Sequence, residues 1–422
     1  MSAVPYQSGG RSSRRTRKLK QAVLACMHRT TDEAAASFAP FNERDWKAAL
    51  FWLDVSGMAL YLLDRVKSLG IEACLPSAIL ARIENNLYEN RQRTQELLDE
   101  AERVSCKFDS AGIPHALLKG ITLTPDSVPH AELRWQTDLD FMIAENDLAV
   151  ARQAVEELGY SLHASDGLTM EFCAGVSGKP DLANLYRAGT QRSMELHGIV
   201  RDAPEADRLG RGQYKCFNSV PLPALCGPDI LVQQAIHLFK HLCGEHSRVS
   251  WVLEFWRHVE ARRADREFWE QVRSIAAETP HADLALAVSG WLAADLFSAI
   301  RCEMEAYWPA VEIPAGVRAW LDCFAHDMLL SDTVGTKTYL LLLPHLPGNR
   351  KSTTAKRRIF PLYLPARITQ AAENETLLAR LGRYRIEAHY CLGRLQFHCV
   401  GGARYAIQAY LWQRKSARFE QS

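Results

Sequence analysis

The sequence predicts an α+β fold in which a small mixed β-sheet core lies between two helical regions. Apolar residues recur at three- and four-residue steps before the core and again after it, which is typical of amphipathic helices. Between these regions, short apolar and alternating runs indicate strands. The predicted parts are a basic tail (1–20), an N-terminal helical region (21–107), an α/β core (108–227) and a C-terminal helical domain (228–422).

Composition excludes several classes of protein. The 422 residues are 47% hydrophobic and 23% charged, the balance of an ordinary globular protein. The 50 basic and 49 acidic residues leave a net charge of +1, which argues against a globally basic nucleic-acid binder. No apolar run approaches the roughly 18 residues that cross a bilayer. The 11 cysteines show no C-x-x-C spacing. We therefore expect a cytoplasmic protein with free thiols and no membrane partner.

The N-terminal third begins with a charged tail and continues with helices. Residues 1–20 hold six basic side chains and no acid among Ser and Gly, which predicts a disordered, solvated tail. A tether to an anionic polymer and an organelle transit peptide are the alternatives. Helices are predicted over Asp45–Val66 and Ile79–Val104, each with an apolar stripe that requires a partner surface.

The core reads as strand, helix, strand, helix, strand. An apolar run, Ile113–Leu118, ends at Lys119-Gly120, where a helix can begin at Ile121. The run Thr137–Ile143 alternates before it becomes fully apolar, as in a strand that enters a core. A helix over Asn146–Leu158 ends at Gly159, and another strand is predicted over Ser193–His197.

The last part is mostly helical. A basic run over Arg350–Arg358 interrupts it and reads as a solvated loop, or as a contact with an acidic ligand such as RNA. The predicted helices cover Asp229–Leu242, Trp251–Arg262, Asp283–Arg301, Val317–Leu330 and Leu377–Val400.

The tripeptide Asp138-Leu139-Asp140 carries the strongest chemical signal. Residues two apart on a strand point to one face, so both carboxylates should project together while Leu139 and Phe141 face the core. Two adjacent carboxylates repel unless a cation neutralises them, and Mg²⁺ prefers oxygen ligands. Most D-x-D tripeptides are solvated strand edges or turns, so the context has to support a metal site.

That context consists of a turn upstream and an acid downstream. Gly120, between a strand and a helix start, would allow backbone N–H groups to approach a phosphate, and Lys119 would add a positive charge. Glu195 lies in the middle of a predicted strand, where a third carboxylate would complete a ligand set for two divalent ions.

These motifs in combination resemble the uncharacterised nucleotidyltransferase family of the polymerase-β superfamily. The resemblance is good over about residues 110–200 and looser through two later helical segments. It rests on Leu117-Leu118-Lys119-Gly120, Arg134, Thr137-Asp138-Leu139-Asp140-Phe141-Met142-Ile143, Leu158-Gly159-Tyr160, Met194-Glu195-Leu196-His197, Ile236–His241 and Trp251–Glu254.

The resemblance implies a polymerase-β-like fold and transfer of a nucleoside monophosphate from a nucleoside triphosphate, with ATP as the expected donor. Asp138, Asp140 and Glu195 would hold two Mg²⁺ ions, and Glu195 would also act on the acceptor hydroxyl. Lys119, Gly120 and Arg134 would bind phosphates. The superfamily's serine after the glycine is Ile121 here, which weakens the expectation for triphosphate binding. The acceptor could be a small molecule, a peptide or protein, or an RNA.

Several residues admit a structural role instead. His237 and His241 share one helix face and could pack or cap, or contact the nucleotide or acceptor together with His197. Arg134 could pair with a carboxylate. The alternative function is a catalytically inactive protein that binds a nucleotide or partner on the same fold. Because the carboxylates repel, we also expect neutralisation of either Asp138 or Asp140 to stabilise the metal-free protein.

Overall fold

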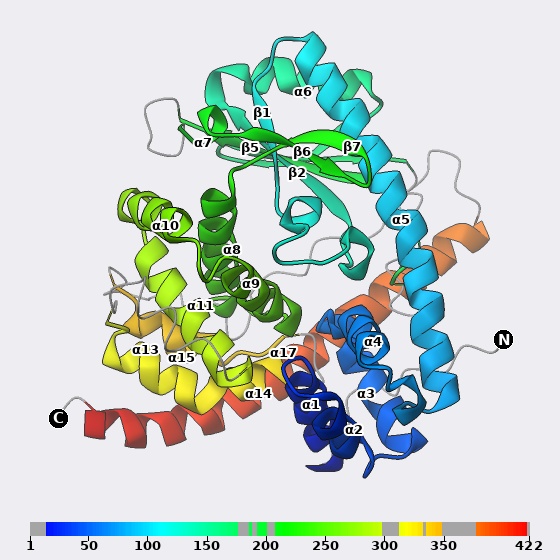
Figure 1. The fold of residues 1–422 in the computed structure, drawn as a ribbon, viewed down its shortest axis with the longest axis vertical. Helices are drawn as coiled ribbons and strands as arrows, with labels where there is room; N and C mark the ends of the chain where they lie inside the picture. Colours follow the sequence, from blue (N-terminus) through cyan, green and yellow to red (C-terminus); the bar gives the residue numbers. More distant parts are fainter. Residues whose placement is uncertain are drawn as a thin grey trace. The chain divides into compact units, whose positions relative to one another are not determined.

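The computed structural model describes residues 14–175, 185–187, 192–200, 207–297, 312–331, 335–347 and 377–419. Figure 1 draws the fold as a ribbon coloured along the sequence. The chain divides into two compact units. The first consists of Met1–Phe239 and Arg248–Glu312, and the second of Lys240–Ser247 and Ile313–Ser422. The first unit therefore contains the predicted N-terminal helices, the α/β core and the beginning of the predicted C-terminal helical region.

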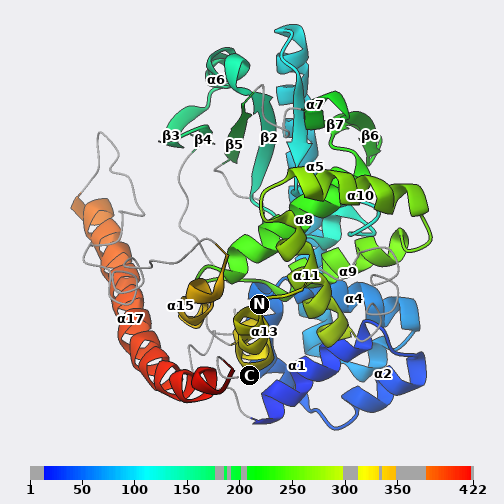
Figure 2. The same cartoon turned by 90° about the vertical axis from the view of Figure 1, so that its left-hand side faces the viewer.

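A seven-stranded mixed sheet forms the centre of the first unit, in the order β3-β4-β5-β2-β1-β7-β6 (Figure 2). The fold-class prediction is confirmed, but β4, β6 and β7 were not predicted. Two prolines, Pro221 and Pro223, conceal β7 because proline cannot donate to a ladder. The strands are β1 (His115–Leu118), β2 (Asp138–Ala144), β3 (Ser161–Asp166), β4 (Thr169–Ala174), β5 (Arg192–Ile199), β6 (Gln213–Phe217) and β7 (Val220–Ala224).

One face of the sheet is covered by α5 (Ser77–Ser110) and α6 (Leu148–Glu157). The predicted alternation on β2 is confirmed, since Leu139 and Phe141 are buried in this core. Phe141 is fully buried, and its ring lies 5.5 Å from that of Phe108 at 90°. Burial of such a side chain contributes about 1.5–3 kcal/mol. The opposite face of β2 is left for Asp138 and Asp140.

From residue 14 onward, four α-helices precede α5, and the first begins earlier than predicted. The predicted tail 1–20 is wrong from Arg14 onward, because α1 covers Arg14–Cys26. Leu19 and Lys20 are fully buried, and Lys20 Nζ lies 5.4 Å from the ring centroid of Trp52. The long apolar stem of lysine can be buried in this way, which the charge pattern concealed. The other three are α2 (Thr31–Phe38), α3 (Glu43–Val55) and α4 (Met58–Leu69).

The sheet is followed by helices α8 (Gly227–Leu242), α9 (Val249–Ala261), α10 (Arg266–Glu278) and α11 (Ala282–Phe297). Figure 1 shows α8 on the side of the sheet opposite α6. In the second unit, the predicted helix over Val317–Leu330 is divided by a π-helical turn at Leu321–Ala325. The basic run Arg350–Arg358 lies outside the described residues. The elements of that unit include α13 (Ala315–Trp320), α14 (His326–Leu329), α15 (Tyr339–Leu342) and α17 (Leu377–Phe419).

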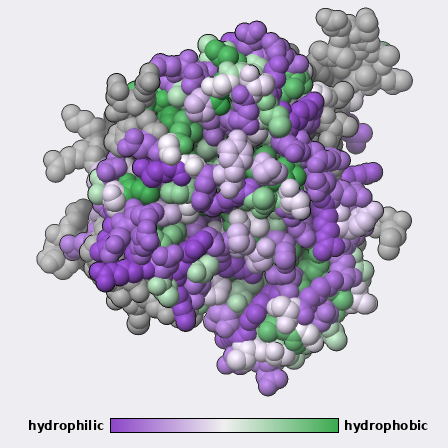
Figure 3. All heavy atoms as spheres, turned by 45° about the horizontal axis from the view of Figure 1, so that its top comes forward, coloured by the Kyte–Doolittle hydropathy of each residue, from purple (hydrophilic) through white to green (hydrophobic). Residues whose placement is uncertain are grey.

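The face drawn in Figure 3 carries mainly hydrophilic side chains, with hydrophobic ones scattered among them. Over the described ranges, no single helix is long and apolar enough to cross a membrane. The consecutive helices α3 and α4, bent by 115° at their junction, are long and apolar enough only when taken together, and by length and composition only.

Candidate active site

The register between β2 and β5 brings together the acids that the sequence separates by more than fifty residues. These strands are parallel neighbours, and Asp140 lies opposite Glu195. Since side chains alternate along a strand, His197 shares a face with Glu195. One ligand atom from each of Asp140, Glu195 and His197 lies within 4.8 Å of the others. Below, these three residues and Asp138 are called the carboxylate cluster.

Asp140 is buried and accepts two charge-assisted hydrogen bonds at one oxygen. Lys119 Nζ donates to Asp140 Oδ1 over 3.0 Å, and His197 Nε2 donates to the same atom over 2.9 Å. Burial alone would raise the pKa of Asp140, but the hydrogen bond from His197 and the charge of Lys119 outweigh it and lower the pKa to about 2. The carboxylate of Asp140 is therefore ionised at neutral pH.

Asp138 is in the opposite situation. It begins β2, and its carboxylate makes no hydrogen bond within the part of the chain that the structure describes. Burial and then the charge of Asp140 raise its pKa, and Glu195 contributes in the same direction. The charges of Lys119 and Arg134 offset this rise in pKa only in part, so a cation bound in the cluster would further stabilise the ionised carboxylate.

His197 lies between two of the acids. Its Nε2 is 3.2 Å from Glu195 Oε2 in addition to its hydrogen bond with Asp140. Burial lowers the pKa of His197, but the hydrogen bonds to Asp140 and Glu195 outweigh this effect and raise it. The sequence suggested His197 only as a contact for acceptor or nucleotide, whereas the structure places it within the carboxylate cluster. Its position two residues after Glu195 was the available signal.

The predicted turn after β1 has an unusual backbone. Lys119 has φ 53° and ψ −158°, and Gly120 has φ 48°. Positive φ is uncommon for a residue with a side chain, and such strain is found at functional sites. A Cβ atom on Gly120 would overlap the buried side chain of Gln136. A short 3₁₀-helix over Gly120–Leu123 follows, so the predicted helix start is present as a single turn.

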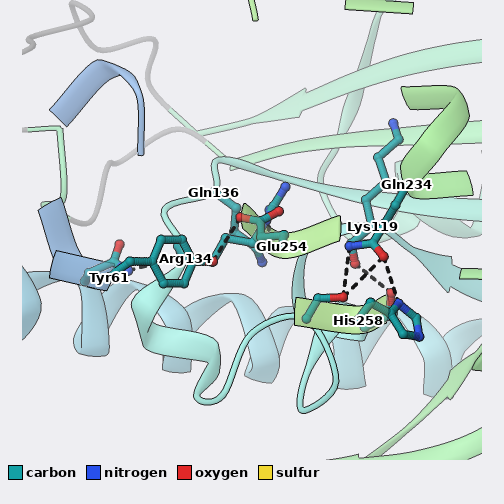
Figure 4. Close-up of polar contacts among 10 residues, drawn as sticks. Tyr61, Lys119, Arg134, Gln136, Gln234, Glu254 and His258 are labelled. Atoms are coloured by element: carbon teal, nitrogen blue, oxygen red, sulfur yellow. Dashed lines mark hydrogen bonds and ion pairs between the residues drawn. The ribbon is translucent and has the colours of Figure 1, made fainter. Parts of the chain in front are cut away.

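Arg134 is part of a buried polar network (Figure 4). Its Nε donates to Glu254 Oε2 over 3.3 Å, and its Nη1 donates to Gln136 Oε1 over 3.3 Å. The Tyr61 hydroxyl donates to Glu254 Oε1 over 2.9 Å. Burial would lower the pKa of Arg134, but the charge of Glu254 outweighs it and raises the pKa. Arg134 thus has a structural partner in α9, and its phosphate role remains a prediction.

A pocket, called here the Lys119 pocket, lies between the turn after β1 and helices α8 and α9. It is lined by polar groups of the turn and of both helices and by apolar side chains. His237 faces this pocket, and its ring lies 4.7 Å from that of Trp251 at 78°. His241 follows on α8, in the segment that belongs to the second unit. The lining residues are Leu118, Lys119, Thr122, Leu123, Arg134, Leu225, Ile230, Gln233, Gln234, His237, Trp251 and Glu254.

The donor set of the carboxylate cluster fits a divalent cation. Asp140 and Glu195 offer carboxylate oxygens, and His197 offers an imidazole nitrogen at ligand-to-ligand spacing. Hard oxygen donors suit Mg²⁺ and Mn²⁺, and imidazole is acceptable to Mn²⁺. Asp138 adds a carboxylate that is destabilised by its neighbours. A bound cation would therefore relieve the repulsion in this cluster.

Comparison with known proteins identifies the family of the chain. No curated protein matches the chain significantly. Among solved structures, the crystal structure of an antigenic nucleotidyltransferase-like protein from Paracoccidioides brasiliensis is similar, at 14% identity and a TM-score of 0.28, covering 46% of this chain and 92% of that one. The model of the family described as "Uncharacterised nucleotidyltransferase" matches residues 42–298, which include every member of the carboxylate cluster and the Lys119 pocket. The chain therefore belongs to this family of uncharacterised nucleotidyltransferases.

Proposed function

We propose that the protein transfers a nucleoside monophosphate from a nucleoside triphosphate, with ATP as the expected donor, to a hydroxyl-bearing acceptor. The observation that carries the proposal is the pairing of Asp140 with Glu195 in the parallel β2–β5 register, beside the strained turn at Lys119-Gly120. Asp138, Asp140 and Glu195 would hold two divalent cations, with His197 as a further donor. Such ions supply charge neutralisation and acceptor activation when they are bound.

The residues of the chain have distinct tasks in this reaction. The acceptor oxygen forms a bond to the α-phosphorus while the bond from that phosphorus to the bridging oxygen breaks, and pyrophosphate leaves. Glu195, the more exposed acid, would accept the proton of the acceptor hydroxyl. Lys119 would move from Asp140 to a phosphate once a cation neutralises that carboxylate. Backbone N–H groups of the turn at Gly120 would bind the phosphates.

A thermal-shift panel tests the proposal. ATP, GTP, CTP and UTP are each measured with Mg²⁺, with Mn²⁺ and with EDTA. We expect a shift for at least one triphosphate that requires the divalent ion, followed by pyrophosphate release when candidate acceptors are added. Absence of any metal-dependent shift would contradict the proposal. A shift without pyrophosphate release from a broad acceptor set would favour the catalytically inactive nucleotide-binding alternative.

A further inference from the structure

A row of apolar side chains lies exposed along one side of α17, the long helix drawn from orange to red in Figure 2. Leu392 is 63% exposed and Ile407 is 64% exposed. Single exposed leucines are common, but apolar side chains that gather on one side of a long helix indicate an interaction surface. The row, called here the outer row, consists of Leu381, Leu392, Leu395, Ile407 and Tyr410.

Helical geometry places these residues on one side. Each residue advances by about 100° around the helix axis, so Leu392 and Tyr410, eighteen positions apart, point in the same direction, and Leu381 lies within about 20° of them. The row covers about 44 Å along the helix, since each residue adds about 1.5 Å. Exposed small side chains lie between its members on the same side, namely Ala388, Cys399 and Ala403.

The opposite side of α17 packs within the second unit, to which the whole helix belongs. Trp412 is buried, and its ring lies 5.5 Å from that of Phe324. Arg394 lies 3.3 Å from Glu245, measured from Nη2 to Oε2. Because Arg394 is two positions after Leu392 and eighteen before Trp412, it shares a side with Trp412 and is turned by about 200° from the outer row. The outer row therefore takes no part in these contacts.

The charge of α17 is strongly positive. Its sequence holds eight Arg or Lys residues and a single acid, Glu387. Arg385 follows Leu381 by one turn, and Arg404 precedes Ile407 by about one turn, so both border the outer row. Both arginines are exposed, and neither pairs with an acid in the part of the chain that the structure describes. The partner of this surface should therefore carry negative charge.

This combination of charge and apolar area selects among the partners. A second copy of α17 would bring like charges together, which is unfavourable. A nucleic acid would pair with the arginines but leave the apolar side chains in water. The surface of an anionic bilayer accepts both, because the headgroups attract the arginines and the boundary with the acyl chains takes up the apolar row.

The composition of α17 also determines how it would meet a bilayer. Arginines recur along the helix, and among the helices of the described ranges none is apolar enough to cross a membrane alone. A helix of this kind lies along the bilayer surface, with its apolar side toward the acyl chains.

We propose that the second unit docks on an anionic membrane surface through the outer row of α17 and the arginines that border it, Arg385 and Arg404. The inference is independent of the transfer reaction. It differs from the sequence-based expectation of no membrane partner, which rested on the absence of a spanning apolar run. Surface docking requires no such run.

The test measures flotation of the full-length protein with vesicles of phosphatidylglycerol and phosphatidylcholine, and with vesicles of phosphatidylcholine alone. We expect wild type to bind the anionic vesicles about tenfold or more tightly than the neutral ones. The double variant Leu392→Gln, Leu395→Gln keeps good helix formers on the surface and should weaken binding to anionic vesicles by about tenfold or more. Arg385→Gln with Arg404→Gln should weaken it by about tenfold as well, and added salt should reduce this difference.

Two matched variants and one substitute keep the result decisive. Val150→Gln removes an exposed apolar side chain of α6, and Arg152→Gln removes an exposed arginine of the same helix. Both should bind vesicles as wild type does. Ile407→Gln carries the test if circular dichroism shows that the double leucine variant fails to fold.

Several outcomes would overturn the inference. Wild-type protein that does not float with anionic vesicles excludes the membrane as the partner. Binding that falls in the arginine variant but not in the leucine or Ile407 variants would be a general attraction of charges. A concentration-dependent dimer that Leu392→Gln, Leu395→Gln dissociates, without vesicle binding, would assign the outer row to a second copy. Tighter binding to a single-stranded RNA than to the vesicles, dependent on the arginines alone, would assign the surface to nucleic acid.

Discussion

Glu254 and Asp138 are both carboxylates of the first unit, yet their surroundings differ. Glu254 accepts a hydrogen bond at each oxygen, from Tyr61 and from Arg134, and is 2% exposed. Asp138 is placed near two further acids, and its pKa is raised by burial and by Asp140. The fold thus compensates one acid completely and leaves the other destabilised.

This difference distinguishes scaffold from chemistry. A buried ion pair that is fully hydrogen-bonded fixes the geometry of its neighbours, and removal of one partner is expensive. A crowded carboxylate without hydrogen bonds of its own, such as Asp138, is unfavourable for stability until a cation binds. Arg134, which the sequence suggested as a phosphate ligand, is paired with the fully hydrogen-bonded Glu254. Lys119 instead donates to Asp140, a carboxylate that a metal ion in the cluster would also bind.

The largest expected effect comes from removing the charges of the crowded acids. The double variant Asp138→Asn, Asp140→Asn should abolish the metal-dependent thermal shift by ATP and lower nucleotide transfer by about 10³-fold, since transition-state charge stabilisation is lost. Asp166→Asn, at the exposed end of β3, is the matched control and should behave as wild type. A double variant that keeps the wild-type shift would show that the assignment of the cluster is wrong.

Neutralising Glu254, whose charge is paired with that of Arg134, should affect stability rather than the metal-dependent thermal shift. Glu254→Gln leaves the buried Arg134 without its counter-ion and should lower the free energy of unfolding by about 3–5 kcal/mol. Urea denaturation measures this loss. Glu156→Gln breaks an exposed i,i+4 pair with Arg152 and should change stability by less than about 0.5 kcal/mol. Similar small losses in both variants would remove the contrast between the two kinds of site.

Within the crowded cluster, the two aspartates should respond with opposite signs. Asp140 has a pKa of about 2, below its ordinary value, so Asp140→Asn should destabilise the metal-free protein by about 2 kcal/mol near neutral pH. The stabilisation by ionised Asp140 is fully present above its unfolded pKa of about 4 and is lost as pH falls toward 2. The difference between wild type and variant should therefore close over that range.

Asp138→Asn should stabilise the metal-free protein, because burial and Asp140 disfavour its charged form. The sequence-based expectation that neutralising either acid is stabilising is thus corrected for Asp140, whose charge Lys119 and His197 compensate. Denaturation in EDTA across pH distinguishes the two. If both variants changed the free energy of unfolding with the same sign, Lys119 and His197 would not stabilise the charge of Asp140 more than that of Asp138.

The smallest difference expected between a variant and its control concerns the turn. Gly120→Ala and Gly167→Ala both place an L side chain at positive φ, which costs about 1–2 kcal/mol. Only the Cβ at position 120 meets another group, the side chain of Gln136, while that at 167 has nothing within 4 Å. We expect about 1 kcal/mol of additional destabilisation at 120, together with weaker ATP binding. Equal losses at the two glycines and unchanged ATP binding would separate the turn from the site.

Prediction from sequence succeeded where local pattern and chemistry agree. The alternation in Thr137–Ile143 matches β2, and the strand predicted around Glu195 matches β5. Strands β4, β6 and β7 were missed because their side chains do not alternate cleanly between core and solvent or because prolines interrupt them. The start of α1 was missed because a charged sequence concealed a buried lysine.

The sequence by itself determined the α+β class, the shared face of Asp138 and Asp140, and the presence of a glycine turn after the first strand, because these depend on residues close together in the chain. The tertiary structure decided which distant groups meet them. The parallel register places Glu195 and His197 beside Asp140, and α9 supplies Glu254 to Arg134. Such contacts arise from strand pairing and helix packing across long loops, and no local periodicity encodes them.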